Sequence, residues 1–140
     1  MIKQVAASIF MFLALAPYAK ADDENDMYAF CFQRLNNEFA SWEEFFELWR
    51  SRRCPEASAV LAEGWADQTT LLLTAKWKLL PQLSELAPAS SDERAFVLRY
   101  IDVTSPGDRL EKLDSLAKED CPTGLSELCS QIRQRVAAAE

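Results

Sequence analysis

The sequence predicts an all-α protein, a compact bundle of about six or seven short-looped helices linked by disulfide bonds. Apolar residues recur at spacings of three and four along the whole chain, which is the period of helices with one buried face. No segment alternates apolar and polar residues over the length of a strand, and the 140 residues include only three glycines. Four cysteines in a small chain indicate two disulfides.

The N-terminus has the organisation of a secretory signal peptide. A positively charged start precedes an apolar stretch over residues 5–16, and residues 19–21 (Ala-Lys-Ala) fit a small-x-small cleavage site. Because a bilayer span takes about 20 apolar residues, we expect no stable membrane insertion. We expect residues 1–21 to be removed and residues 22–140 to form a single helical domain. The expected location is the periplasm, with secretion from the cell as the second choice.

The chain is acidic, with 22 Asp and Glu against 15 Lys and Arg and a formal net charge of −7. All the acidic residues follow Ala21, whereas Lys3 and Lys20 fall within the predicted signal peptide. A negative surface repels phosphate groups, so nucleic acid is not an expected partner. The charge suits a basic protein partner, although solubility alone is the simpler explanation.

Two helices are expected in the first third of the domain. The first begins after the acidic residues 22–26, with Asp26 as its N-cap. The second begins at a capping box in which Ser41 is the cap and Glu44 reaches back. One face of this helix carries Trp42, Phe45, Phe46 and Trp49. We interpret that face as core, and an exposed anchor for a partner is the alternative.

A long third helix is expected from Pro55 to Leu80, ended by the proline that follows. Residues 81–86 are expected to form a short extra turn. A second capping box then starts the next helix, with Ser90 as the cap and Glu93 as its partner. The remaining apolar faces carry Phe96, Val97, Tyr100 and Ile101, then Leu110, Leu113, Leu116 and Ala117, then Leu125, Leu128, Cys129, Ile132 and Val136.

The cysteines are Cys31, Cys54, Cys121 and Cys129. If the first two helices are antiparallel, Cys54 lies beside Cys31 in an early turn of the first helix, and the two can bond. The other pair, Cys121 and Cys129, would lie about 12 Å apart if Pro122 began a regular helix. Their bond therefore requires the helix to begin nearer Gly124, with Thr123 as its cap. A metal site is the weaker alternative, because the chain has neither CxxC nor histidine.

The residue types argue against enzymatic chemistry, so we expect no catalytic residue, no metal and no cofactor. The absence of histidine removes Ser-His-Asp and Cys-His catalysis as usually built. The remaining enzyme hypothesis is glycan cleavage by Glu43 and Glu47, beside Trp42. We favour the alternative that these glutamates form the solvated side of an amphipathic helix, because the capping box already accounts for Glu44.

In organisation, the chain resembles the periplasmic immunity proteins of type VI secretion amidase effectors. The shared features are a signal peptide, a helical domain of roughly one hundred residues, disulfide cysteines and acidic charge. Cys31 near the first helix and Cys121 and Cys129 near the end correspond loosely to cysteines of that group. The resemblance implies an immunity protein that inhibits a toxin or cell-wall hydrolase by occupying its active-site cleft, often as a homodimer.

The resemblance also implies that an acidic loop or helix end enters that cleft. The candidates are residues 90–93, with Asp92 and Glu93, and residues 105–108, with Asp108. Three further candidates for contacting a partner come from the residues themselves, and they are Trp77, Arg52 and Arg53. Trp77, between two lysines, is the tryptophan we expect at the surface. The arginines suit an acidic partner or an anion, or simply the negative end of a helix.

Two other binding functions stay open. Aromatic-rich helical bundles can enclose a pocket, so the chain could carry a small apolar ligand. An exported chaperone or assembly adaptor would instead present exposed apolar surface to its clients.

Overall fold

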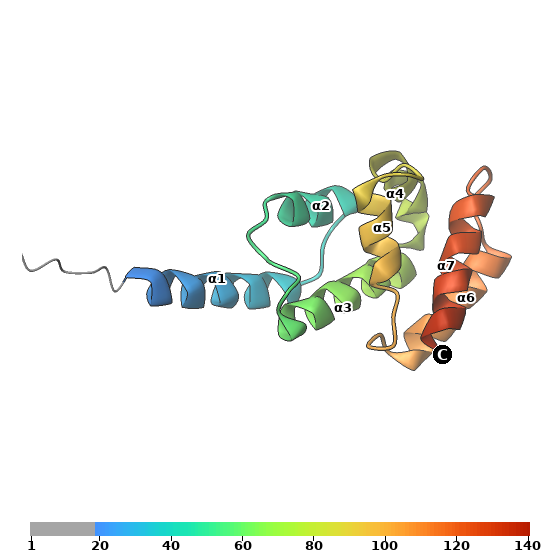
Figure 1. The fold of residues 1–140 in the computed structure, drawn as a ribbon. Coiled ribbons are helices and arrows are strands. Elements are labelled where there is room, and N and C mark those ends of the chain that lie inside the picture. Colours follow the sequence, from blue (N-terminus) through green and yellow to red (C-terminus); the bar gives the residue numbers. More distant parts are fainter. Residues whose placement is uncertain (1–18) are drawn as a thin grey trace, which may run out of the picture.

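Seven α-helices and one 3₁₀ helix make up the described part of the chain, residues 19–140 of a computed structural model (Figure 1). They are α1 Ala19–Leu35, α2 Trp42–Arg50, α3 Ala59–Ala75, η1 Trp77–Leu79, α4 Leu80–Leu86, α5 Asp92–Arg99, α6 Gly107–Glu119 and α7 Ser126–Ala139. No strand occurs among these residues, so the all-α prediction is confirmed. Most of the predicted signal peptide lies outside the described residues. None of the described helices is long and apolar enough to cross a membrane.

The aromatic face of α2 is the centre of the core, as predicted. Ser41 caps this helix by accepting a hydrogen bond from the backbone N–H of Glu44 at 3.3 Å. The four aromatic side chains of α2 are buried. Phe45 packs edge-to-face against Trp65 of α3, with ring centroids 5.3 Å apart, and Trp65 packs in the same way on Phe96 of α5 at 5.2 Å. These aromatic contacts join three helices, at about 1.5–3 kcal/mol for each large side chain buried.

α3 lies in the middle of the fold, packed against α1 on one side and α6 on another. It buries four polar side chains, Gln68, Thr69, Thr70 and Thr74. Thr70 donates to the carbonyl of Ala66 at 3.0 Å, and Thr74 donates to that of Thr70 at 2.8 Å. Bonds of this kind back onto the same helix let a threonine hydroxyl be buried without a partner from elsewhere.

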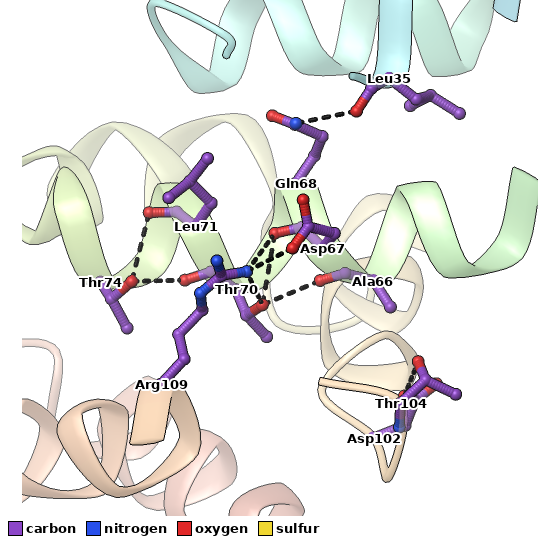
Figure 2. A network of polar contacts seen from close by, with 10 residues as sticks. All are labelled: Leu35, Ala66, Asp67, Gln68, Thr70, Leu71, Thr74, Asp102, Thr104 and Arg109. Atoms are coloured by element: carbon purple, nitrogen blue, oxygen red, sulfur yellow. Dashed lines mark hydrogen bonds and ion pairs between the residues drawn. The ribbon is translucent and has the colours of Figure 1, made fainter. Parts of the chain in front are cut away.

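Two side chains tie α3 to its neighbours (Figure 2). Gln68 donates through Nε2 to the carbonyl of Leu35 at 2.8 Å, which satisfies an acceptor that the end of α1 leaves free. Arg109, near the start of α6, donates to the Asp67 carboxylate at 2.6 Å and to the Thr70 hydroxyl at 3.2 Å. Hydrogen bonds thus hold both α1 and α6 against the same segment of α3, residues 66–70.

Both predicted disulfides are present. Cys31 and Cys54 have Cα atoms 5.5 Å apart, and the Cα atoms of Cys121 and Cys129 are 6.1 Å apart. The second bond forms because the chain turns at Gly124, whose φ of +83° favours glycine, before α7 begins at Ser126. The cap predicted at Thr123 is wrong, because no side chain caps α7.

The N-terminal ends of α1 and α3 differ from the prediction. α1 already includes Ala19, the first described residue, so the acidic residues 22–26 lie inside the helix and Asp26 is not its cap. No proline or glycine interrupts this stretch, and the helix continues through it. α3 begins at Ala59 instead of Pro55. The segment before α3 packs against the end of α5, because Arg99 and Tyr100 both donate hydrogen bonds to the carboxylate of Glu56.

The cap of α5 lies one residue later than predicted. Ser91, rather than Ser90, accepts a hydrogen bond from the backbone N–H of Arg94 at 3.1 Å. This register buries the Arg94 side chain, which donates to the carbonyl of Ala87 at 2.9 Å and to Gln131 of α7 at 3.0 Å. Burial lowers the pKa of Arg94 from its ordinary value, and the charge of Glu127 opposes that shift. The side chain therefore links α4, α5 and α7.

Tyr100 gives the fold a marker at alkaline pH. Burial, with the neighbouring charge of Glu56, raises its pKa to about 12, from an ordinary value of 10.0. Since the unfolded chain loses this proton first, the contribution to stability is complete below pH 10 and falls as pH rises from 10 to about 12. A titration followed at 295 nm should show one tyrosine that ionises near pH 12, and this phase should be absent in Tyr100→Phe. The free energy of unfolding of the variant should fall less than that of wild type between pH 10 and about 12. An unchanged late phase in the variant would contradict the assignment.

Candidate functional site

A groove between α1 and α3 exposes large apolar side chains. We call it the α1–α3 groove, and it is lined by Phe32, Leu35, Asn36, Val60, Leu61, Glu63, Gly64 and Asp67. Its volume is about 210 Å³. Phe32 and Val60 are each 57 % exposed, although most large apolar side chains in the described chain are buried. Tyr28, one helical turn before Phe32, is also exposed and extends the same face of α1.

The groove exists because the two helices approach closely at one point and diverge beyond it. Gly64 is that point, since a Cβ atom there would lie 3.0 Å from the Cβ of Leu35. Beyond this contact, the N-terminal half of α1 runs out from the body of the molecule (Figure 1). No other helix of the described residues covers the side of α1 that carries Phe32, which is therefore more than half exposed.

The polar rim of the groove is acidic. Glu63 and Asp67 line it, and no Lys or Arg does. The Asp67 carboxylate is paired with Arg109 at 2.6 Å, whereas within the described chain no cation lies within ion-pair distance of Glu63. Residues 23–26 of α1, three of them acidic, are exposed as well. An apolar groove with this rim complements a surface that is apolar at its centre and basic around it.

The second half of α1 is held on the body by several independent contacts. Cys31, the residue before Phe32, forms a disulfide with Cys54 in the segment after α2. Arg34 forms an ion pair with Glu44 of α2. The guanidinium of Arg53 lies over the ring of Phe30, 3.8 Å from its centroid. The exposed phenylalanine is therefore presented from a fixed stretch of helix.

The acidic candidates for partner contact do not come together in one place. Asp92 is exposed in the first turn of α5, and Glu93 beside it bonds Arg50 of α2 at 3.2 Å. Asp108 is exposed at the start of α6, beyond the other end of α5. α5 separates the two acidic segments, so they could not enter one narrow cleft side by side.

The prediction that Trp77 lies at the surface is wrong. Its side chain is 6 % exposed, and its Nε1 donates to the carbonyl of Asp120 at 2.8 Å. The chain turns into η1 at this residue, which directs the indole inward against the end of α6 while the neighbouring Lys78 stays outside. Two lysines beside a tryptophan do not reveal the direction of its side chain.

Arg52 and Arg53 are exposed, as a contact with a partner would require. The guanidinium of Arg52 lies over the ring of Trp49, 5.0 Å from its centroid, and Arg52 has a φ of 58°, in the left-handed region. Both arginines therefore cover aromatic rings. They are also neighbours of Arg50, at the negative end of α2.

Tyr28, Phe32 and Val60 are absent from the sequence-based candidates. The fact that Tyr28 and Phe32 are four residues apart, and so share a helix face, was a signal available in the sequence. What it could not show is that this face lacks a neighbour. In the described chain, no three acidic or cysteine side chains group as metal ligands would. Glu43 and Glu47 are exposed on α2, in accord with the solvated side of a helix.

Comparisons with known proteins add no relative. No family model, curated protein or solved structure gives a significant match to the chain. Its function therefore has to be argued from the geometry of its own surface.

Removing the Cys31–Cys54 bond should loosen the groove. The residues it joins are 23 apart, so the double variant Cys31→Ser/Cys54→Ser should lose about 3 kcal/mol of unfolding free energy. Because this bond fixes α1, hydrogen exchange of the α1 amides should accelerate more than that of α7. The control is Cys121→Ser/Cys129→Ser, which opens a loop closed over only 8 residues. If this control instead accelerated exchange, relative to wild type, more in α1 than in α7, the assignment would be contradicted.

Proposed function

We propose that the chain is an exported, non-enzymatic binding protein that inhibits a basic protein partner by docking it on the α1–α3 groove. The partner class is a secreted toxin or a cell-wall-degrading hydrolase. The observation that carries the proposal is the exposure of Phe32 and Val60 on either side of one groove with an acidic rim. Rigid apolar side chains surrounded by polar groups are typical anchors of protein interfaces.

The charge of the chain supports a basic partner. Acidic residues exceed basic ones by 22 to 15, and the rim of the groove has the same sign. Opposite charges on two surfaces accelerate their association and disfavour wrong partners, while an apolar centre supplies affinity. An immunity protein, which has to capture its toxin quickly, benefits from both properties.

The disulfides support export. Two bonds join all four cysteines, and such bonds persist in the periplasm and outside the cell but are rare in the cytosol. The N-terminal pattern of a signal peptide leads to the same compartment. A periplasmic site of action fits a protein that meets a cell-wall hydrolase where that enzyme works.

The test uses the oxidised protein as bait in an extract of its source, followed by mass spectrometry and an activity assay of what is retained. Wild type should retain one stoichiometric basic protein and inhibit its activity. Phe32→Glu should weaken the interaction about tenfold or more, because it places a charge at the apolar centre of the interface. Val60→Glu should do the same from the other side of the groove.

Val103→Glu is the matched control, since Val103 is 76 % exposed on the loop before α6 and outside the groove. It should bind as wild type does, and thermal unfolding should show that all three variants are folded. Equal affinity of wild type and Phe32→Glu would refute docking on the groove. A loss confined to Asp92→Ala/Asp108→Ala would instead assign binding to the acidic loops. Many weakly held clients in place of one partner would indicate a chaperone or adaptor.

The same variants test for a homodimer. If a second copy covers the groove, sedimentation should show a dimer for wild type that Phe32→Glu converts to a monomer. A monomeric wild type would leave the groove free for the partner.

A further inference from the structure

We infer that a second groove, around Trp77, binds a small amphiphile with an apolar body and one carboxylate. We call it the Trp77 groove, and it is lined by Thr74, Ala75, Lys76, Trp77, Lys78, Leu79, Leu116 and Asp120. No residue is common to this set and the α1–α3 groove. The inference is therefore independent of the proposed inhibitory function.

The size and lining of the groove suit a small molecule. It has a volume of about 500 Å³, within the range of ordinary ligand sites. Trp77, Leu79 and Leu116 form its apolar part, where the end of α3 and η1 meet the last turns of α6. An apolar chain or ring placed there would lose its contact with water, which is the main source of affinity for such ligands.

The floor of the groove is fixed before any ligand arrives. The indole N–H of Trp77 is already bonded to the carbonyl of Asp120, so it leaves no unsatisfied donor in the floor, and the side chain itself is only 6 % exposed. The backbone is held as well, because the N–H of Lys76 donates to Leu72 at 3.0 Å and that of Leu79 donates to Lys76 at 2.8 Å. Such preorganisation reduces the entropy that binding has to overcome.

The charges select an anion. Lys76 and Lys78 flank Trp77 on the η1 side, and Asp120 is the single acidic residue in the lining. The ammonium of Lys76 lies 3.3 Å from the carbonyl of Ala40, and Lys78 is exposed with no ion pair in the described chain. In a chain with more acidic than basic residues, this groove has the opposite balance. A carboxylate would lie at the lysine edge, with its apolar body towards Leu116.

The test titrates the oxidised protein with decanoate, below its micellar concentration, by calorimetry and by NMR of the indole N–H groups. We expect saturable binding, with a shift of the indole signal that disappears in Trp77→Phe. Lys78→Gln should weaken binding about fivefold, as expected for one exposed ion pair. The matched control Lys112→Gln, an exposed lysine of α6 outside the groove, should bind as wild type does.

Decanol separates the contribution of charge from that of the apolar chain, and it should bind more weakly than decanoate. Equal affinity for the two, or equal effects of Lys78→Gln and Lys112→Gln, would overturn the selection of an anion. No saturable binding would overturn the site. Loss of decanoate binding in Phe32→Glu would assign the ligand to the other groove, and the partner assays above do not depend on the result.

Discussion

The arrangement of the described helices depends on α3 being buried on several sides at once. It contacts α1 and α6 and shares the aromatic core with α2 and α5 through Trp65. A helix that is buried on several sides has few solvent-exposed positions, so any polar side chain on it is largely buried. Here two threonines bond back onto the helix, Gln68 donates to the end of α1, and Arg109 of α6 donates to α3. These directional bonds favour one arrangement of helices over others that apolar contacts alone would permit, although the buried Thr69 hydroxyl and Gln68 Oε1 have no hydrogen-bond partner in the described chain.

The proposed function depends on the position of α1. A helix at the edge of a bundle could have turned all its apolar side chains inward. Instead, a disulfide, an ion pair and a cation–π contact hold it with Phe32 facing water. Because Phe32 is 57 % exposed, this arrangement forgoes about 1 kcal/mol of burial free energy. In the proposed complex, a partner that covers the ring would recover this free energy, so binding would add to the stability of the fold.

The two grooves differ in charge as well as in position. The α1–α3 groove has carboxylates at its rim, whereas the Trp77 groove has two lysines beside an apolar floor. Each is bounded on one side by α3 or its C-terminal extension η1. The central helix therefore supports both candidate sites, and no single surface variant should affect both. A macromolecule and a small anion could be bound together without competing for residues.

The sequence by itself determined the helical class and the aromatic core of α2, and it predicted both disulfide pairings, the second only if the last helix began near Gly124. These follow from local period, from the Ser41 capping box and from the geometry of antiparallel helices, all of which act over short distances along the chain. The start of α3, the burial of Trp77 and the exposure of Phe32 were decided by tertiary structure. Each depends on parts of the fold distant in the chain: Glu56 is held by Arg99, Trp77 is bonded to Asp120, and no helix of the described residues covers Phe32. Periodicity shows which residues can be buried, but only packing decides which apolar face stays uncovered, and that face carries the proposed function.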